Sequence, residues 1–67
     1  MYVIAMKDTR EEYYNGKKYM YQGEYYASID NIDNAKKYKS LKMAEKGLNS
    51  IKNNCAFGYE FYIKELK

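Results

Sequence analysis

The chain has no histidine, no proline and no tryptophan, a single cysteine and only four glycines. Without histidine, a histidine-based catalytic triad, a histidine general base and a histidine-ligated zinc site are excluded. Cys55 has no partner for an intramolecular disulfide, which suits a reducing compartment, and we expect it to be a small, buried or half-buried apolar side chain. The scattered glycines form no phosphate-binding loop. These absences argue against an enzyme and against a bound cofactor or metal ion.

Long apolar runs and a surplus of acidic residues are also missing. The opening stretch MYVIAMK is followed at once by the charged stretch DTREE. This apolar run is too short for a signal peptide, and no segment approaches the length of a membrane span. The net charge of +3 argues against a decoy that mimics DNA with an acidic surface, and favours anionic partners only slightly. We therefore expect a cytoplasmic protein that has no membrane partner.

A length of 67 residues allows one domain, spanning residues 1–67. Ordering each residue costs roughly 1.5 kcal/mol, so the margin of stability in so small a chain is thin. Small domains often gain stability by pairing with a second copy, which leaves a homodimer as an open alternative.

The N-terminal half has the pattern of β-strands. Residues 1–7 carry apolar side chains on both faces, which predicts a central strand. Asn15-Gly16 lies between aromatic runs and is a strong hairpin signal, because both residues tolerate the positive φ of a type I′ turn. We place the two strands of this hairpin at residues 11–14 and 17–22, with a second break or a bulge at Gln22-Gly23. Extended chain then continues over residues 24–29, and the charged residues 8–12 form a turn or a frayed extension.

The second half begins with a helical pattern. Asp30 or Asn31 can cap a short helical turn that runs to Lys37. Ser40 is a good N-cap for a main helix over residues 41–54. One stripe of this helix is apolar and predicts packing on the sheet, which explains it better than a membrane-surface role. The residues of this stripe are Leu41, Ala44, Leu48 and Ile51.

The chain closes with the stretch FGYEFYIKELK, in which alternate residues are apolar and predict a strand. Phe57, Tyr59, Phe61 and Ile63 are expected on its core face. The predicted fold class is therefore α+β: an antiparallel sheet of three or four strands, with one main helix on one face.

Six of the ten tyrosines lie between Glu12 and Tyr26. Neighbouring strand residues point to opposite faces, so each Tyr-Tyr pair sends one ring away from the helix. One helix of this length covers one face of a sheet, so the other face should expose several rings. Tyrosine is enriched at protein interfaces, where its ring acts as an anchor. The residues predicted to contact a partner are Tyr13, Tyr14, Lys17, Tyr19, Tyr21, Tyr25 and Tyr26.

Tyrosines in this pattern are also compatible with two further roles. Cross-strand ring pairs stabilise a thin sheet by roughly 0.2–1 kcal/mol each, without any partner. The same rings, flanked by lysines such as those of KKYK, could stack on single-stranded nucleic acid or on a nucleotide. The stretch FGYEFYI is weakly similar to the aromatic strand of RNA-recognition modules, but Phe57 stands where Lys or Arg is expected and Glu60 adds negative charge.

The order of these elements resembles small proteins encoded by phages and prophages of A+T-rich bacteria. The resemblance rests on MYVIAMK, the tyrosine-rich hairpin, DNIDNAKKYKSLKMAEKGL and YEFYIKEL, and its most specific part runs from Ile32 through Ser40 to Ala44. Some such proteins inhibit bacterial defence systems, anti-CRISPR proteins among them. The resemblance thus implies a non-enzymatic inhibitor or accessory protein that binds a host protein in the bacterial cytoplasm.

Overall fold

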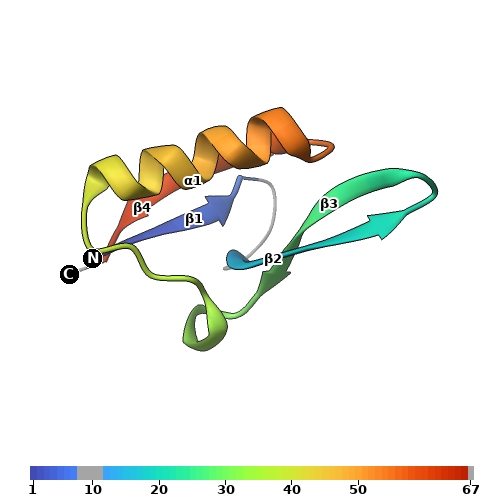
Figure 1. Ribbon diagram of the computed structural model, residues 1–67. Helices are drawn as coiled ribbons and strands as arrows, with labels where there is room; N and C mark the ends of the chain where they lie inside the picture. The colour runs from blue at the N-terminus through green and yellow to red at the C-terminus, as the bar shows by residue number, and fades with distance from the viewer. Residues whose placement is uncertain (8–11, 67) are drawn as a thin grey trace.

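The structure is a computed structural model that describes residues 1–7 and 12–66. One main helix lies along one face of a single antiparallel sheet, whose four strands are arranged in the order β3-β2-β1-β4 (Figure 1). Two short 3-10 helices, η1 and η2, lie in the connections. The elements are β1 (Tyr2–Met6), β2 (Tyr13–Tyr21), β3 (Glu24–Asp30), η1 (Ile32–Asn34), α1 (Leu41–Asn54), η2 (Gly58–Glu60) and β4 (Phe61–Glu65). The predicted α+β fold is confirmed, and so is the central position of the first strand.

Helix α1 begins and ends where the sequence predicts. The Ser40 hydroxyl accepts a hydrogen bond of 3.2 Å from the backbone N–H of Met43, which satisfies a donor that the first turn leaves unpaired. Ala44 and Ile51 are fully or almost fully buried against the sheet, whereas Leu41 at the start of the stripe is half exposed. The helix is therefore anchored to the sheet along the stripe from Ala44 to Ile51.

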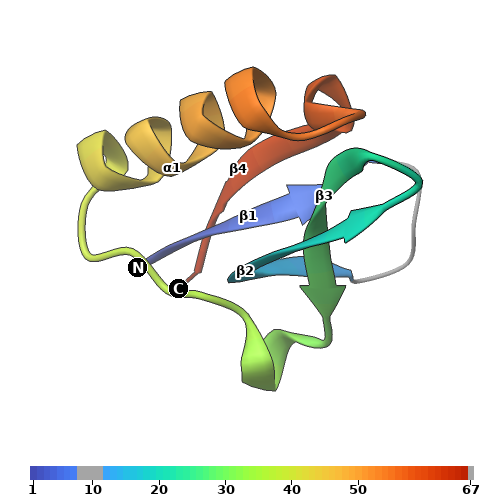
Figure 2. The ribbon, with the colours of Figure 1, turned by 45° about the vertical axis from the view of Figure 1, so that its right-hand side comes forward.

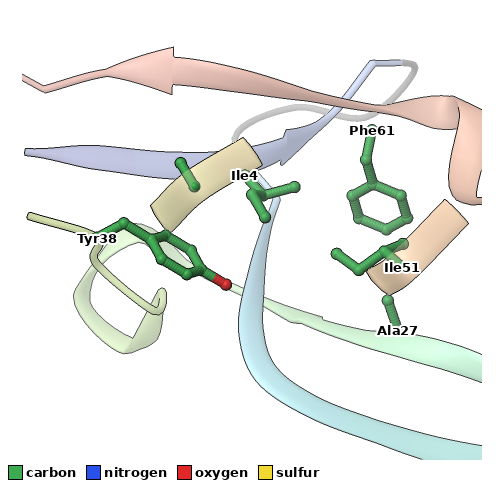
Figure 3. Close-up of a cluster of buried hydrophobic side chains, with 6 residues drawn as sticks. Ile4, Ala27, Tyr38, Ile51 and Phe61 are labelled. Atoms are coloured by element: carbon green, nitrogen blue, oxygen red, sulfur yellow. The ribbon is translucent and has the colours of Figure 1, made fainter. Parts of the chain in front are cut away.

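The main core lies between α1 and the sheet (Figure 3). Ile4 of β1, Ala27 of β3, Phe61 of β4 and Ile51 of α1 meet there, together with Tyr38. Cys55 is half-buried beside this cluster, as expected for a small apolar side chain.

The other face of the sheet is covered in part, which corrects the expectation of a face left bare. Val3 and Ala5 point away from α1 and are buried with Tyr13 and Ala35 in a second, smaller cluster. Ala35 follows the 3-10 helix η1, whose start is capped by the Asn31 side chain; η1 ends at Asn34, short of the predicted Lys37. The chain between β3 and α1 therefore packs against the sheet on the side opposite the helix.

The hairpin turn lies at Gln22-Gly23, and the predicted turn at Asn15-Gly16 is wrong. Tyr21 pairs with Glu24 across a two-residue loop in which Gln22 has φ 51° and Gly23 has φ 82°. Positive φ at both central residues is the pattern of a type I′ turn, whose twist matches that of the strands. Strand β2 instead runs through Asn15-Gly16 without reversing.

Asn15-Gly16 forms a bulge in β2. Tyr14 pairs with Ile29 and Lys18 with Ala27, so the three residues 15–17 stand opposite Ser28 alone. Gly16 supplies the φ of 91° that this detour needs, and the Asn15 amide donates a hydrogen bond of 3.1 Å to the Ser28 hydroxyl. Asn15-Gly16 therefore forms a bulge, and the backbone freedom that it uses is the same freedom that would favour a turn.

Beyond the bulge, β2 no longer runs beside β1, and another segment fills the gap. Strands β1 and β2 pair at Ala5 and Tyr13, at the start of β2. Residues 36–38, which we call the wedge segment, pair with both strands. The Lys36 N–H donates to the Tyr14 carbonyl at 3.0 Å, and Tyr38 exchanges two hydrogen bonds of 2.8 and 2.9 Å with Tyr2. The wedge segment therefore replaces the missing stretch of β1–β2 pairing.

The last strand is shorter than predicted. It spans Phe61–Glu65, with Phe61 buried and Ile63 half-buried as expected, but Phe57 and Tyr59 are exposed and not in the core. Gly58 packs so closely on the end of α1 that an added Cβ would lie 2.5 Å from the Lys52 Cα. This contact holds the chain in the turn of η2, and the strand cannot begin until the turn is complete.

The turn or extension expected over residues 8–12 lies outside the described residues except for Glu12, as does the predicted strand start at Glu11. Within residues 1–7 and 12–66, no helix is both long enough and apolar enough to cross a membrane.

Gly47 in the middle of α1 gives a direct test of the wedge segment. A Cβ at this position would lie 2.5 Å from the Tyr38 hydroxyl oxygen and 2.9 Å from Cζ. Glycine normally costs a helix up to about 1 kcal/mol relative to alanine, but overpacking costs about 1–3 kcal/mol. We expect Gly47→Ala to lower the free energy of unfolding by about 1 kcal/mol, measured by urea denaturation.

The matched control is Asn49→Ala, two residues further along and exposed to solvent. This change should raise the free energy of unfolding by a few tenths of a kcal/mol, roughly the difference in helix propensity. If Gly47→Ala stabilised the protein as much as Asn49→Ala, Tyr38 would not pack against the helix as described.

Candidate protein-interaction surface

Five aromatic side chains form a continuous row on the outside of the molecule, which we call the aromatic surface. Tyr26 is at its centre, stacked on Tyr19 with ring centroids 5.6 Å apart and on Phe57 at 6.2 Å. Tyr21 meets Tyr26 edge-on at 6.4 Å, and Tyr59 lies 6.2 Å from Phe57. The separations are those of favourable aromatic pairs, so the rings hold one another in place.

Two distant parts of the chain build this surface. Tyr19 and Tyr26 face each other across the β2–β3 ladder, on the distal half of the hairpin. Phe57 and Tyr59 come from the connection between α1 and β4. The Ala56 N–H donates a hydrogen bond of 2.8 Å to the Tyr25 carbonyl, which ties this connection to strand β3. Figure 2 shows the end of α1 and the chain after it reaching the upper end of β3.

The rings of the aromatic surface are open to solvent. Tyr19, Tyr21, Phe57 and Tyr59 are between 52% and 64% exposed, and Tyr26 between them is half-buried. Scattered exposed apolar residues are ordinary, whereas a contiguous apolar patch is the usual mark of an interaction site. The arrangement can therefore present several rigid, flat rings to a partner at once.

Phe57 is held in a backbone conformation that a phenylalanine seldom adopts. Its φ is 60° and its ψ is 25°, in the left-handed region, where a side chain with a Cβ is strained by about 1 kcal/mol or more. The ring is more than half exposed, and the packing that it gains comes from its contacts with Tyr26 and Tyr59. Glycine would adopt this conformation without strain, so the phenylalanine ring is present despite a backbone cost.

The opposite side of the same hairpin is also exposed. Met20 and Tyr25 pair across the strands, and each has over two fifths of its surface open to water. The Lys18 ammonium lies 5.1 Å from the centroid of the Tyr25 ring, a cation–π contact. The distal hairpin thus offers a second apolar face that carries a positive charge.

The electrostatics of the aromatic surface centre on Tyr26. Its hydroxyl donates a hydrogen bond of 3.4 Å to the Glu24 carboxylate. Partial desolvation and the negative charge of Glu24 raise the pKa of the Tyr26 phenol above its usual value. The Tyr26 hydroxyl therefore stays protonated near neutral pH, beside the Glu24 carboxylate. Among the described residues, no group of three or more acidic or cysteine side chains could hold a metal ion.

The predicted contact residues fall into four groups. Tyr19, Tyr21 and Tyr26 belong to the aromatic surface, and Tyr25 lies on the other side of the hairpin. Lys17 is exposed beside the bulge. Tyr13 is buried at 5% exposure, and Tyr14 is half-buried against the main core. Ala35 packs with Tyr13 on the face opposite the helix, and Tyr14 packs against the main core, so neither belongs to the aromatic surface.

Three exposed residues, Phe57, Tyr59 and Met20, were missed by sequence patterning. Alternation with Phe61 and Ile63 placed Phe57 and Tyr59 on the core face of a strand. The signal that points the other way is Gly58, because glycine inside a strand pattern often marks a break or a close backbone approach. Met20 is exposed opposite Tyr25, on the side of the hairpin away from the aromatic surface.

No family model matches the chain, and neither the curated proteins nor the solved structures that were searched include a match.

The strain at Phe57 can be measured by comparing two substitutions that both remove the ring. In ordinary loop conformations alanine is more stabilising than glycine by about 0.4–1 kcal/mol, whereas at positive φ the order reverses. We expect Phe57→Gly to have a free energy of unfolding about 1 kcal/mol higher than Phe57→Ala, by chemical denaturation. Tyr59 provides the control, since Tyr59→Ala should be more stable than Tyr59→Gly. The same order at both positions would contradict the left-handed conformation of Phe57.

Proposed function

We propose that this chain is a non-enzymatic binding protein that docks on a partner protein through the aromatic surface. The observation that supports this most directly is the row of five rings, four of them more than half exposed, with Phe57 kept in a strained conformation. Large exposed aromatics that are already held in place lose little conformational entropy on binding, and they are the usual anchors of protein interfaces.

The charge around the rings favours a protein over a nucleic acid. Glu24 is hydrogen bonded to the central ring, and its carboxylate would repel a phosphate backbone. Lys17 and Lys18 precede the rings on β2, but Lys18 points to the other side of the hairpin, over Tyr25. Binding of single-stranded nucleic acid or of a nucleotide by ring stacking is the alternative function of the same surface.

The resemblance to small phage-encoded proteins makes a host protein the partner class that we propose first. A component of a bacterial defence system, such as a CRISPR effector, is the specific form of this proposal. The few acidic residues make a mimic of nucleic acid in a basic channel a poor fit. Inhibition would follow from occupying a protein surface or an allosteric site.

Affinity capture from a bacterial lysate with quantitative mass spectrometry tests the docking surface. The variant combines Tyr19→Ala with Phe57→Ala, and its control is Tyr62→Ala, which removes an exposed tyrosine of β4 that makes none of these ring contacts. Loss of an aromatic anchor typically costs about 2 kcal/mol or more, so capture of the specific partner should fall at least about tenfold. Circular dichroism establishes that all variants are folded. Equal capture by the three proteins would remove the aromatic surface as the site.

The nucleic-acid alternative is tested by fluorescence anisotropy with a labelled oligothymidine. We expect no binding at low ionic strength. Binding that weakens steeply with added salt and requires Tyr19 would favour stacking of bases on these rings.

Sedimentation at several protein concentrations tests whether the chain forms a homodimer. Self-association that disappears in the Tyr19→Ala, Phe57→Ala variant would identify a second copy of the chain as the partner.

A further inference from the structure

A pocket of about 470 Å³ opens between α1 and the wedge segment, on the side of the bulge away from the aromatic surface. One wall is a single face of the helix, formed by Met43, Lys46, Gly47 and Ser50. The other wall is Tyr14 of β2 and the wedge segment, residues 36–38. None of these residues belongs to the aromatic surface, so the pocket does not depend on the proposed docking of a partner protein.

The charged side chains that line the pocket in the described part of the chain are all positive. Among the described residues that line it, three are lysines and none is acidic. The Lys37 ammonium is already engaged, because it donates hydrogen bonds to the carbonyls of Ile32 at 3.0 Å and Ala35 at 3.4 Å. Lys36 and Lys46 therefore remain available to a ligand, and they approach from opposite walls.

The position of Lys36 is set by its surroundings. Its backbone N–H is bound to Tyr14, and its Cδ packs where a side chain on Gly16 would otherwise lie. Its ammonium is 5.5 Å from the centroid of the Tyr38 ring, a cation–π contact that holds the charge next to the pocket. A lysine that is ordered in advance loses less entropy when it binds an anion.

Neutral hydrogen-bonding groups and an apolar wall complete the lining. Burial raises the pKa of the Tyr14 and Tyr38 phenols, so both hydroxyls stay protonated near neutral pH and can donate. The Ser50 hydroxyl adds a further polar group. Met43 is more than half exposed and offers a polarisable side chain that suits an aromatic ring. Gly47 contributes no side chain to the helix wall, and the Tyr38 hydroxyl lies there, 2.5 Å from where a Cβ would be.

We propose that this pocket binds a nucleoside monophosphate or a closely similar phosphate ester, with the phosphate between Lys36 and Lys46 and the base against Met43 and Tyr14. Lysine ammonium groups are strong partners for phosphate oxygens, and the two hydroxyls add donors of the kind that phosphates accept. Inorganic phosphate alone would leave most of the space empty, because pockets of about 300–1,000 Å³ typically enclose whole small molecules.

The proposal is tested by titrating the full chain with adenosine monophosphate, adenosine and inorganic phosphate, by isothermal titration calorimetry and amide NMR. The nucleotide should bind with a dissociation constant on the order of 0.1 mM or below, which corresponds to one modest charged contact and one apolar contact. It should shift the amide signals of Gly47 and Lys36. Adenosine and inorganic phosphate should each bind at least tenfold more weakly.

Lysine variants then locate the site. Lys46→Gln should weaken nucleotide binding about tenfold, since Lys46 is an exposed residue whose loss leaves the helix intact. The charge-matched control is Lys42→Gln on the same helix outside the pocket, and it should change affinity less than twofold. An equal loss of nucleotide affinity in both variants would show that the binding is general charge attraction, and it would overturn the site. Absence of binding by any phosphate, or equal binding of phosphate and nucleotide, would overturn the proposal, and neither result bears on the aromatic surface.

Discussion

The separation of β2 from β1 at the Asn15-Gly16 bulge is the constraint on which the rest of the structure depends. Because β1 and β2 stop pairing there, a gap opens in the sheet, and the wedge segment fills it through hydrogen bonds to Tyr14 and Tyr2. This placement brings Tyr38 into the main core against Gly47, and Ala35 onto the opposite face beside Tyr13. A short connection thus becomes part of the sheet and of both cores, in a chain too small to form a deep core from its strands and helix alone.

The same separation divides the chain into a packed part and a projecting part. Helix α1 contacts β1 and β4, while the hairpin beyond the bulge extends past the helix and is exposed on both sides (Figure 1). Residues before the bulge, such as Tyr13 and Tyr14, are buried or half-buried. Residues after it, such as Tyr19 and Tyr21, are exposed although they have the same chemistry. Distance along β2 from the bulge, more than residue type, therefore decides which tyrosines can meet a partner.

The sequence predicts the elements that are determined by residues close together in the chain, and it does not predict those that depend on distant contacts. The helix follows from Ser40 and an apolar stripe, which act within a few residues, and the central strand follows from side chains that are apolar on both faces. Asn15-Gly16 supports a turn and a bulge equally well by backbone freedom. Contacts from Lys36, twenty residues away, decide between them. Phe57 was missed for a similar reason, since the packing of Gly58 on Lys52 breaks a strand pattern that alternation alone would extend.

The thin stability margin of a chain of 67 residues connects the fold to the proposed function. Four of the five rings on the aromatic surface are more than half exposed, and Phe57 adds a strained backbone. A ring that is exposed in the free protein gains its burial when a partner covers it, and any ligand that binds only the folded state stabilises it by mass action. In the proposed complex, burial of the Phe57 ring would add to the offset that its contacts with Tyr26 and Tyr59 give in the free chain. The proposed docking would therefore supply the burial that four of these rings lack in the free chain.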